Sequence, residues 1–518
     1  MNKCKTILYE ILRVLALFFA VFFVYYLCNI SYTISAFKFG YLTIGILIIY
    51  LVYCICEKKL DKKRIIFMIL ALGILLRMIY GGYNNIFSRQ HDVGKANETG
   101  HYGYALYIYR NGMLPDTNID QFYQPPLNAW LQAKWMKLFQ FILPIPEHVK
   151  DLYLSSINSG VKFKYNNDLL NYFNSLYNSC RILGTFYSSI TLLLIYKILK
   201  EFKLKDYTLY IILLVMATQP VLVMMSGTMN NDNLSYVFFF SALLFAIRWF
   251  KKQTYIDIVL VAISIGLGMI TKLSIGFIAL VIGPMMLVKL IQRFKEKTYL
   301  KLLPQFVVFA MIVFPLGLSY AIRNYLLFNQ GLTYILDFGR DSWLHAVIKE
   351  KNIFERFFSL PISQLIHKER GIFHDYQEYN IWVDLIKTSI FEEFSYNADG
   401  CVLGALMYLI IVPYWLLLIP VIIYIINRII KKTYTGDMML TIICLALVIL
   451  ALFSYVSLCV KMPYGCTSNF RYISYISFAM IVLYALALEH TTNTQFRNAC
   501  YLILSVFAGL TTLFILVI

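Results

Sequence analysis

The stretch IIFMILALGILLRMIYGG, residues 65–82, is followed closely by the polar stretch SRQHDVG, residues 88–94. The first stretch is apolar and nearly long enough to cross the hydrocarbon core of a bilayer, which takes about 20 residues. If it spans a membrane, Asp92 lies at the water boundary just beyond its end, with Arg89 and His91 beside it. The sequence therefore predicts a polar site at a membrane surface.

The composition sets the class of protein. With 60% hydrophobic and 17% aromatic residues and a mean hydropathy of +0.66, this 518-residue chain is too apolar for a soluble globular protein. A formal net charge of +18 would suit nucleic acid, but Lys and Arg fall mainly in short clusters between apolar runs. Such clusters are typical of cytoplasmic loops. We expect a multi-pass membrane protein with membrane lipids, and no nucleic acid, as partners.

Apolar stretches recur along the chain and predict an all-α polytopic membrane protein with about thirteen transmembrane helices. Two short stretches meet at Lys272, so they form either two spans or a re-entrant hairpin. The predicted spans are 7–30, 39–56, 65–82, 176–198, 207–225, 234–250, 256–271, 273–290, 303–321, 402–427, 438–460, 471–488 and 498–518.

The basic clusters predict the orientation, because all of them fall on one side if the spans alternate. That side is expected to be cytoplasmic. The other side then carries two long extracytoplasmic segments, 83–175 and 322–401, and Asp92 with them. The clusters are Lys3 and Lys5, Lys58 to Arg64, Lys197 to Lys205, Arg248 to Lys252, Lys289 to Lys301 and Arg428 to Lys432.

Both long outer segments are expected to contain interfacial helices. Pro125-Pro126 opens a helix whose apolar residues, from Leu127 to Ile142, recur at helical spacing, and whose Asn128 and Gln132 are expected to turn away from that apolar face. Asn111-Gly112 is predicted to end the helix before it. The second segment is expected to form amphipathic helices over Asp341 to Phe358 and before Phe391.

Polar residues collect at the outer ends of the predicted spans: Asp232, Lys272, Arg323 and Arg471. Each has a structural alternative, since an Asp caps helices and Lys or Arg anchors helix ends by snorkelling. Together, carboxylates and cations at one boundary suit a reaction that deprotonates one group and expels an anion. Sugar transfer from a lipid phosphate has that demand. Because nucleotide-activated sugars are cytoplasmic, a transferase on the far face needs a donor that has crossed on a lipid.

The sequence resembles the GT-C superfamily of polytopic glycosyltransferases, which contains the protein O-mannosyltransferases and the lipid A aminoarabinose transferase. It is more similar to uncharacterised bacterial members. The resemblance covers residues 65 to 490. The motifs that carry it are Arg89-Gln90-His91-Asp92-Val93, Gly100-His101-Tyr102-Gly103-Tyr104, Tyr123-Gln124-Pro125-Pro126-Leu127, Gly227-Thr228-Met229-Asn230-Asn231-Asp232, Thr271-Lys272, Ile322-Arg323-Asn324-Tyr325, Lys387-Thr388-Ser389-Ile390-Phe391 and Phe470-Arg471-Tyr472.

The resemblance implies a role for each group of residues. Asp92 is the catalytic base of an inverting transfer from a polyprenyl-phosphate sugar, supported by His91, and Asp232 is the second acidic residue. The remaining implied residues hold the donor phosphate (Lys272, Arg323, Arg471 and Arg89) or lie at the acceptor side (His101, Tyr123 and Gln124). Asp92 and Asp232 are also the candidates for a divalent cation, Mg²⁺ or Mn²⁺, and metal dependence stays open.

The expected organisation is a two-helix addition over 1–64, a catalytic module over 65–490 and a last helix over 491–518. The acceptor, a protein, lipid or glycan, and the sugar stay open, as does transfer of a longer glycan. Together with the resemblance to bacterial GT-C members, the Lys-, Asn-, Ile- and Tyr-rich composition favours a location in a bacterial plasma membrane over one in the endoplasmic reticulum. The alternatives are a transporter or flippase of a polyprenyl-linked glycan, which the lack of an internal repeat disfavours, and a non-catalytic assembly factor.

Overall fold

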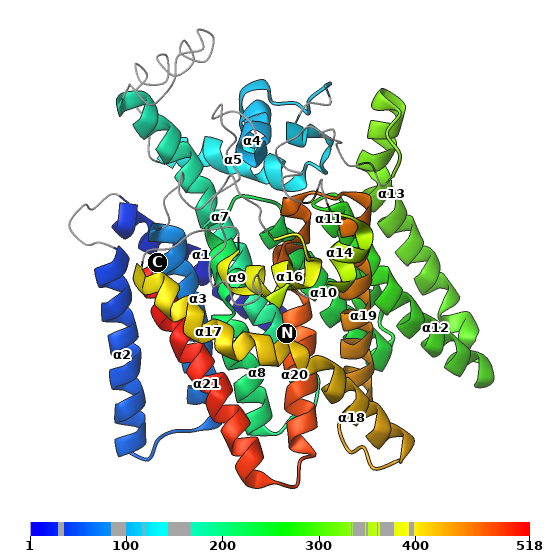
Figure 1. Cartoon of the computed structure of the whole chain (residues 1–518). Helices are drawn as coiled ribbons and strands as arrows, with labels where there is room; N and C mark the ends of the chain where they lie inside the picture. Colours follow the sequence, from blue (N-terminus) through cyan, green and yellow to red (C-terminus); the bar gives the residue numbers. More distant parts are fainter. Residues whose placement is uncertain are drawn as a thin grey trace.

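The structure is a computed structural model of the chain. It describes residues 2–29, 36–83, 100–117, 120–142, 167–332, 334, 348, 351–359, 361–362, 378–392 and 398–518. These residues form helices and connecting turns and contain no strand, which confirms the all-α polytopic class (Figure 1). Arg89, His91 and Asp92 lie outside the described residues.

Nine helices of the described part of the chain are long and apolar enough to cross a membrane. They comprise most of α1 (Asn2–Asn29), α3 (Lys62–Tyr83), α7 (Asn167–Lys200), α10 (Asp232–Lys252), η4 (Leu273–Ile278) with α12 (Ala279–Lys295), η5 (Tyr299–Lys301) with α13 (Leu303–Phe328), α17 (Ala398–Leu416) with α18 (Leu418–Ile430), α19 (Met438–Lys461) and α21 (Thr494–Val517).

The count of thirteen spans is not confirmed, because four predicted spans form shorter or broken helices. Helices α11 (Tyr255–Met269) and α20 (Ile476–Glu489) are short, and the apolar stretch of α2 (Ala36–Cys56) is Gly40–Cys56. The stretch 207–225 forms α8 (Asp206–Thr218) and a second arm, α9 (Pro220–Met224) with η3 (Met225–Gly227), bent by 53°. Proline disfavours helical backbone in the residue before it, and Gln219, which precedes Pro220, is non-helical with ψ of 119°. The break follows from that one proline.

Arg77 of α3 satisfies the backbone at this break. Its side chain is buried and donates to the Ala217 carbonyl at 2.8 Å, to the Ser188 hydroxyl at 2.9 Å and to the Met216 carbonyl at 3.4 Å. A broken helix leaves carbonyls without their usual partners, and the bonds to the Ala217 and Met216 carbonyls replace them. The second arm of the bent pair leads directly into Thr228, so the break positions the loop before α10.

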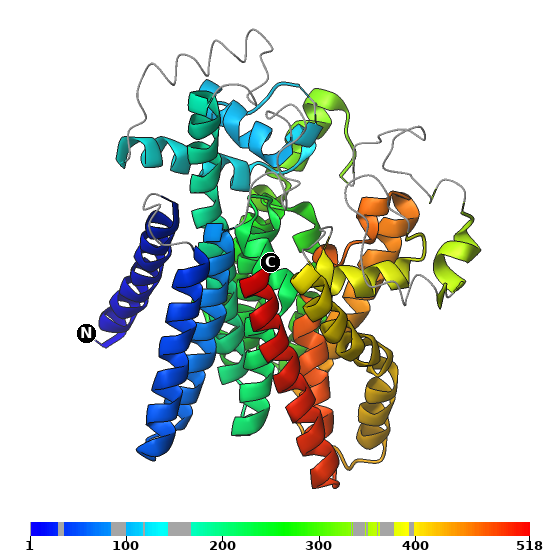
Figure 2. The same ribbon diagram turned by 60° about the vertical axis from the view of Figure 1, so that its left-hand side comes forward.

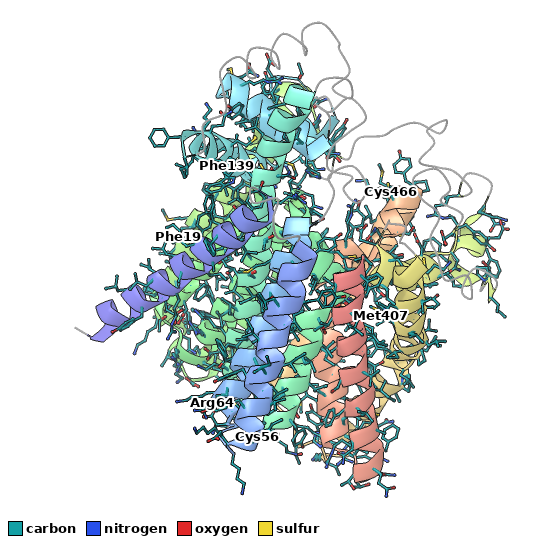
Figure 3. The ribbon with its side chains drawn as sticks, turned by 90° about the vertical axis from the view of Figure 1, so that its left-hand side faces the viewer. Phe19, Cys56, Arg64, Phe139, Met407 and Cys466 are labelled. Carbon is teal, nitrogen blue, oxygen red and sulfur yellow. The ribbon has the colours of Figure 1, made fainter. Side chains whose placement is uncertain are left out.

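The basic loops lie together at one end of the bundle, and the first outer segment lies at the other (Figures 1 and 2). At the basic end, Lys62 pairs with Asp206 at 2.5 Å and Arg248 pairs with Glu201 at 2.7 Å. These two ion pairs link the start of α3 to the start of α8, and the end of α10 to the connection between α7 and α8. In Figure 3, Arg64 marks this end and Phe139 lies toward the opposite one. The bundle therefore separates its charged loops in the way that the sequence predicts.

The first outer segment forms α4 (Gly100–Asn111), η1 (Asp120–Tyr123) and α5 (Leu127–Ile142). The predicted end of α4 is confirmed, since Gly112 has φ of +70° and its N–H donates to the Ile108 carbonyl at 2.9 Å. The helix after Pro125-Pro126 is also confirmed. Its predicted faces were wrong: Asn128 and Gln132 are buried, whereas Ile142 is half exposed. The two amides turn inward because they donate to a backbone carbonyl of the site described below.

The second outer segment contains α14 (Ile353–Phe358) and α16 (Ile381–Phe391). Only the end of the predicted helix Asp341 to Phe358 falls within the described residues, and Asn352 caps it there by accepting from the Glu355 N–H. The predicted helix before Phe391 exists as α16. It is not interfacial, however, because nearly all of its residues are buried against neighbouring helices.

Candidate active site

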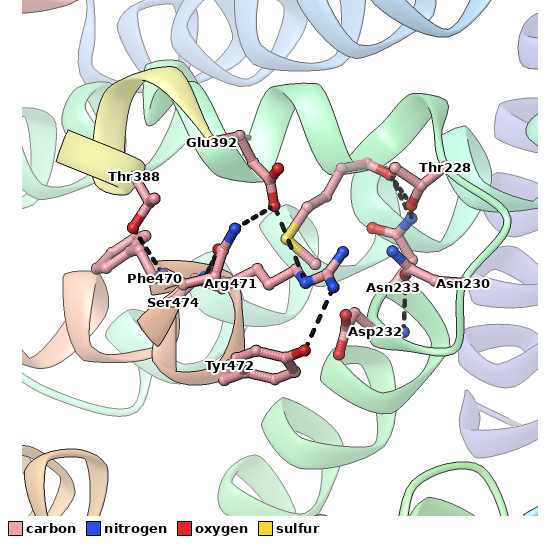
Figure 4. Close-up of polar contacts among 12 residues, drawn as sticks. Thr228, Asn230, Asp232, Asn233, Thr388, Glu392, Phe470, Arg471, Tyr472 and Ser474 are labelled. Atoms are coloured by element: carbon pink, nitrogen blue, oxygen red, sulfur yellow. Dashed lines mark hydrogen bonds and ion pairs between the residues drawn. The ribbon is translucent and has the colours of Figure 1, made fainter. Parts of the chain in front are cut away.

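The first part of the site is the loop that leads into α10. Asp232 begins the helix, and its N–H donates to the Asn230 side chain at 3.0 Å. The Asn233 amide donates to the Thr228 hydroxyl at 3.3 Å, and the Thr228 N–H donates to the Met225 carbonyl at 2.9 Å (Figure 4). These bonds fix the loop from within. A carboxylate at this position also gains from the partial positive charge of the helix N-terminus.

Neighbouring helices hold the same loop from outside. The Asn128 amide of α5 donates to the Met229 carbonyl at 3.0 Å, and Gln132 donates to the same oxygen at 2.5 Å. On α7, a Cβ added at Gly184 would stand 2.4 Å from the Thr228 carbonyl oxygen. Only glycine permits so close an approach. The loop is therefore enclosed by two helices that come from separate parts of the sequence.

Asp232 forms an ion pair with Lys272, which lies in the turn between α11 and η4. The Asp232 side chain is 5% exposed and that of Lys272 is 21% exposed. A carboxylate so far removed from water needs a charged partner, and the ammonium supplies it. The ion pair therefore joins one acidic and one basic residue that the sequence predicts at the ends of separate spans.

Arg471 of η8 (Phe470–Ile473) is, after Lys272, the second cation beside the aromatic ring of Tyr472. The centroid of the Tyr472 ring is 5.1 Å from Lys272 Nζ and 5.1 Å from Arg471 Cζ, within the range of cation–π attraction. The Arg471 backbone is fixed as well, because the Tyr236 hydroxyl of α10 donates to its carbonyl at 2.5 Å. Figure 4 shows the Arg471 side chain extended toward Asp232.

Glu392, at the end of α16, is a site residue that the sequence analysis missed. Its Oε1 accepts from the Asn469 amide at 3.1 Å and lies 4.0 Å from Arg471 Nε. The Glu392 side chain is 5% exposed. The available signal was the motif Lys387 to Phe391, which stops one residue before it. Nothing in the local sequence pairs this glutamate with a residue almost eighty positions later.

Two outer residues also meet the cluster. The Asn231 amide donates to Gln124 Oε1 at 2.8 Å and to the Thr271 carbonyl at 3.1 Å, so it joins three segments beside Asp232. His101 of α4 lies where the charges of Asp232, Arg471 and Lys272 act on it. Desolvation lowers the pKa of His101 to about 4; the Asp232 carboxylate opposes this shift, and the two cations add to it. The imidazole is therefore neutral near pH 7.

Two further predicted residues, Arg323 and Tyr123, make contacts between the first outer segment and α13. Arg323 of α13 donates to the Pro115 carbonyl and lies 5.4 Å from the centroid of the Tyr320 ring. Tyr123 offers its backbone carbonyl to the Asn324 amide at 3.2 Å, and its ring packs edge-on against Tyr334. Their contacts fasten the first outer segment to α13. A role for Arg323 at the donor phosphate stays a prediction, as do those of Asp92, His91 and Arg89.

The described part of the site does not fit a divalent cation. The Asp232 carboxylate already pairs with the Lys272 ammonium. No group of three or more His, Cys, Asp or Glu side chains in the described ranges could hold a metal. Two cations, two carboxylates and a phenol are instead arranged to bind an anionic group and a polar one side by side.

Comparison with known proteins gives one match. Residues 170–318 match the family model described as dolichyl-phosphate-mannose-protein mannosyltransferase, a family of GT-C type. This is less than a third of the chain, and it includes Asp232 and Lys272. No curated protein and no solved structure matches. The match confirms the resemblance to these membrane glycosyltransferases.

Proposed function

We propose, from the match of residues 170–318 to a family of GT-C-type membrane glycosyltransferases, that this chain transfers a sugar from a polyprenyl phosphate to an extracytoplasmic acceptor. The observation that carries the proposal is the cation cluster of Lys272 and Arg471 around Tyr472, beside Asp232. It lies at the end of the bundle away from the basic loops. A lipid-linked phosphate held there would keep its polyprenyl chain among the apolar helices.

The two cations suit a departing phosphate. Lys272 and Arg471 would bind the phosphate oxygens of the donor and stabilise the negative charge that develops on the leaving oxygen. Arg offers a planar fork for two oxygens, and Lys offers a compact point charge. Asp232 and Glu392 hold the two cations in place before the donor arrives. Arg89 and Arg323 are further candidates for the same phosphate.

The transfer itself is a single displacement. The acceptor hydroxyl oxygen forms a bond to the anomeric carbon, while the bond from that carbon to the phosphate oxygen breaks and leaves its electron pair on phosphate. Asp92 takes the hydroxyl proton, and His91 supports it. Attack opposite the leaving group inverts the anomeric configuration. His101, being neutral, and Gln124 would hydrogen-bond the acceptor without adding charge.

The distribution of charge supports the orientation. Loops rich in Lys and Arg stay on the cytoplasmic side of a membrane, so the cluster would face the outside of a bacterial plasma membrane. An acceptor there is a cell-envelope glycan, a lipid or a protein. The first donor to test is polyprenyl-phosphate mannose, since the matching family acts with a mannosyl lipid according to its description.

The test is transfer by purified protein in nanodiscs, with radiolabelled polyprenyl-phosphate sugars and a crude cell-envelope acceptor. We expect wild type to transfer or slowly hydrolyse one donor, and D92N and K272M to lose that activity. D206N is the matched control, because Asp206 is an exposed aspartate at the basic end. Activity should persist in EDTA. Equal activity in D92N and wild type would remove Asp92 from the chemistry. Failure of wild type to turn over any donor would favour the flippase alternative.

A further inference from the structure

Three hydrogen bonds join α16 and its C-terminal end to the segment that carries Arg471. The Ser468 hydroxyl donates to Asp384, the Phe470 N–H donates to Thr388 Oγ1 at 2.9 Å, and the Asn469 amide donates to Glu392 at 3.1 Å. Residues 384, 388 and 392 are spaced by four, so they lie on one face of a helix. These bonds set the register of Arg471 against α16.

The helix is itself anchored by a buried ion pair. Lys387 Nζ lies 2.8 Å from Glu378 Oε1, and the two side chains are 1% and 5% exposed. Removing either charge from such a pair would leave the other buried and uncompensated. The end of α16, where Glu392 lies, is therefore held on a rigid element.

Glu392 has a backbone conformation that L-residues rarely adopt, with φ of 54° and ψ of −132°. Glycine would occupy it without steric cost, whereas a residue with a side chain is strained there. The side chain that causes the strain is buried and lies beside Arg471. Strained residues of this kind are concentrated at functional sites, where the surrounding contacts hold them in place.

We propose that Glu392 is a positioning residue, which holds Arg471 in the orientation that binds the donor phosphate; this inference rests on the proposed function. Glu392 acts in two ways. Its carboxylate forms an ion pair with the guanidinium at 4.0 Å. Through Asn469 it also fixes the turn from which Arg471 projects, since the Arg471 N–H donates to Asn469 Oδ1 at 2.8 Å. The strained backbone aims the carboxylate at both partners.

The experiment measures binding of a radiolabelled polyprenyl phosphate, without sugar, to the full-length protein in nanodiscs, together with thermal unfolding. We expect E392G to weaken binding about tenfold, as for one lost charge-assisted hydrogen bond, while its midpoint of unfolding stays equal or rises. E392Q should bind within about threefold of wild type, because its amide oxygen still accepts from Asn469. K432G is the matched control: Lys432 also has positive φ, 55°, at the basic end.

A second comparison tests whether Glu392 acts through Arg471. In an R471Q background, E392G should produce no further loss of binding. Equal losses in both backgrounds would overturn the inference, and so would wild-type binding by E392G. If wild type binds polyprenyl phosphate and only these comparisons fail, the positioning role alone is refuted. If wild type binds none, the proposed donor is refuted, and the positioning role with it.

Discussion

Replacing Lys272 by methionine is expected to destabilise the protein more than replacing both Lys272 and Asp232. The methionine keeps an apolar stem but removes the ammonium from an aspartate whose side chain is 5% exposed. Breaking a buried ion pair by removing one partner costs about 3–5 kcal/mol. Because the Lys272 side chain is 21% exposed, we expect the lower end, about 3 kcal/mol. In the double variant D232N/K272M, the uncompensated charge is gone, so about 2 kcal/mol should return.

The measurement is the free energy of unfolding of wild type, D232N, K272M and D232N/K272M, obtained by SDS titration in mixed micelles. The four values form a double-mutant cycle, which isolates the coupling between the two side chains. Donor transfer is measured on the same samples, and K272M should be inactive even where it is fully folded. A double variant no more stable than K272M would refute the interpretation of this pair as a buried, mutually compensating one.

Three further predictions concern elements around the site. R77L should lower the free energy of unfolding by about 3 kcal/mol, because it leaves the carbonyls at the α8–α9 break without donors; an unchanged value would contradict that role. Since the lowered pKa of His101 means that the unfolded chain binds its proton first, stability should fall as pH falls from 7 to 5. That fall should be about 2 kcal/mol larger in wild type than in H101N. G184A should destabilise by about 2 kcal/mol and reduce transfer, because its Cβ would meet the Thr228 carbonyl. G283A, where the same Cβ meets nothing within 4 Å, is its control, and equal effects would refute the close-packing argument.

Much of the fold can be predicted from local properties of the sequence. Hydropathy depends only on which residues are adjacent, so the apolar stretches, their helical character and the separation of basic loops from the site end could all be predicted. The same holds for turn chemistry: Gly112 ends α4 where the sequence predicts it. The expected count of thirteen spans is not confirmed at Pro220 or at three shorter apolar helices, because length in sequence does not reveal where a helix bends or begins.

Other features needed the tertiary structure, since they depend on partners far apart in the chain. Asn128 and Gln132 look like a solvent-facing stripe, and only packing shows that both donate to the Met229 carbonyl. Spacing predicted that Asp232, Lys272 and Arg471 share one boundary, but not that two of them pair.

The sequence alone determined a helical membrane protein that resembles the GT-C glycosyltransferases and carries ionisable residues at the ends of its spans. Only the tertiary structure decided which of those residues meet. It joined Lys272 to Asp232, placed Arg323 against Pro115 and brought Glu392 to Arg471. The physical reason is that periodicity and hydropathy are local properties, whereas the partner of a buried charge is set by how helices pack across the bundle.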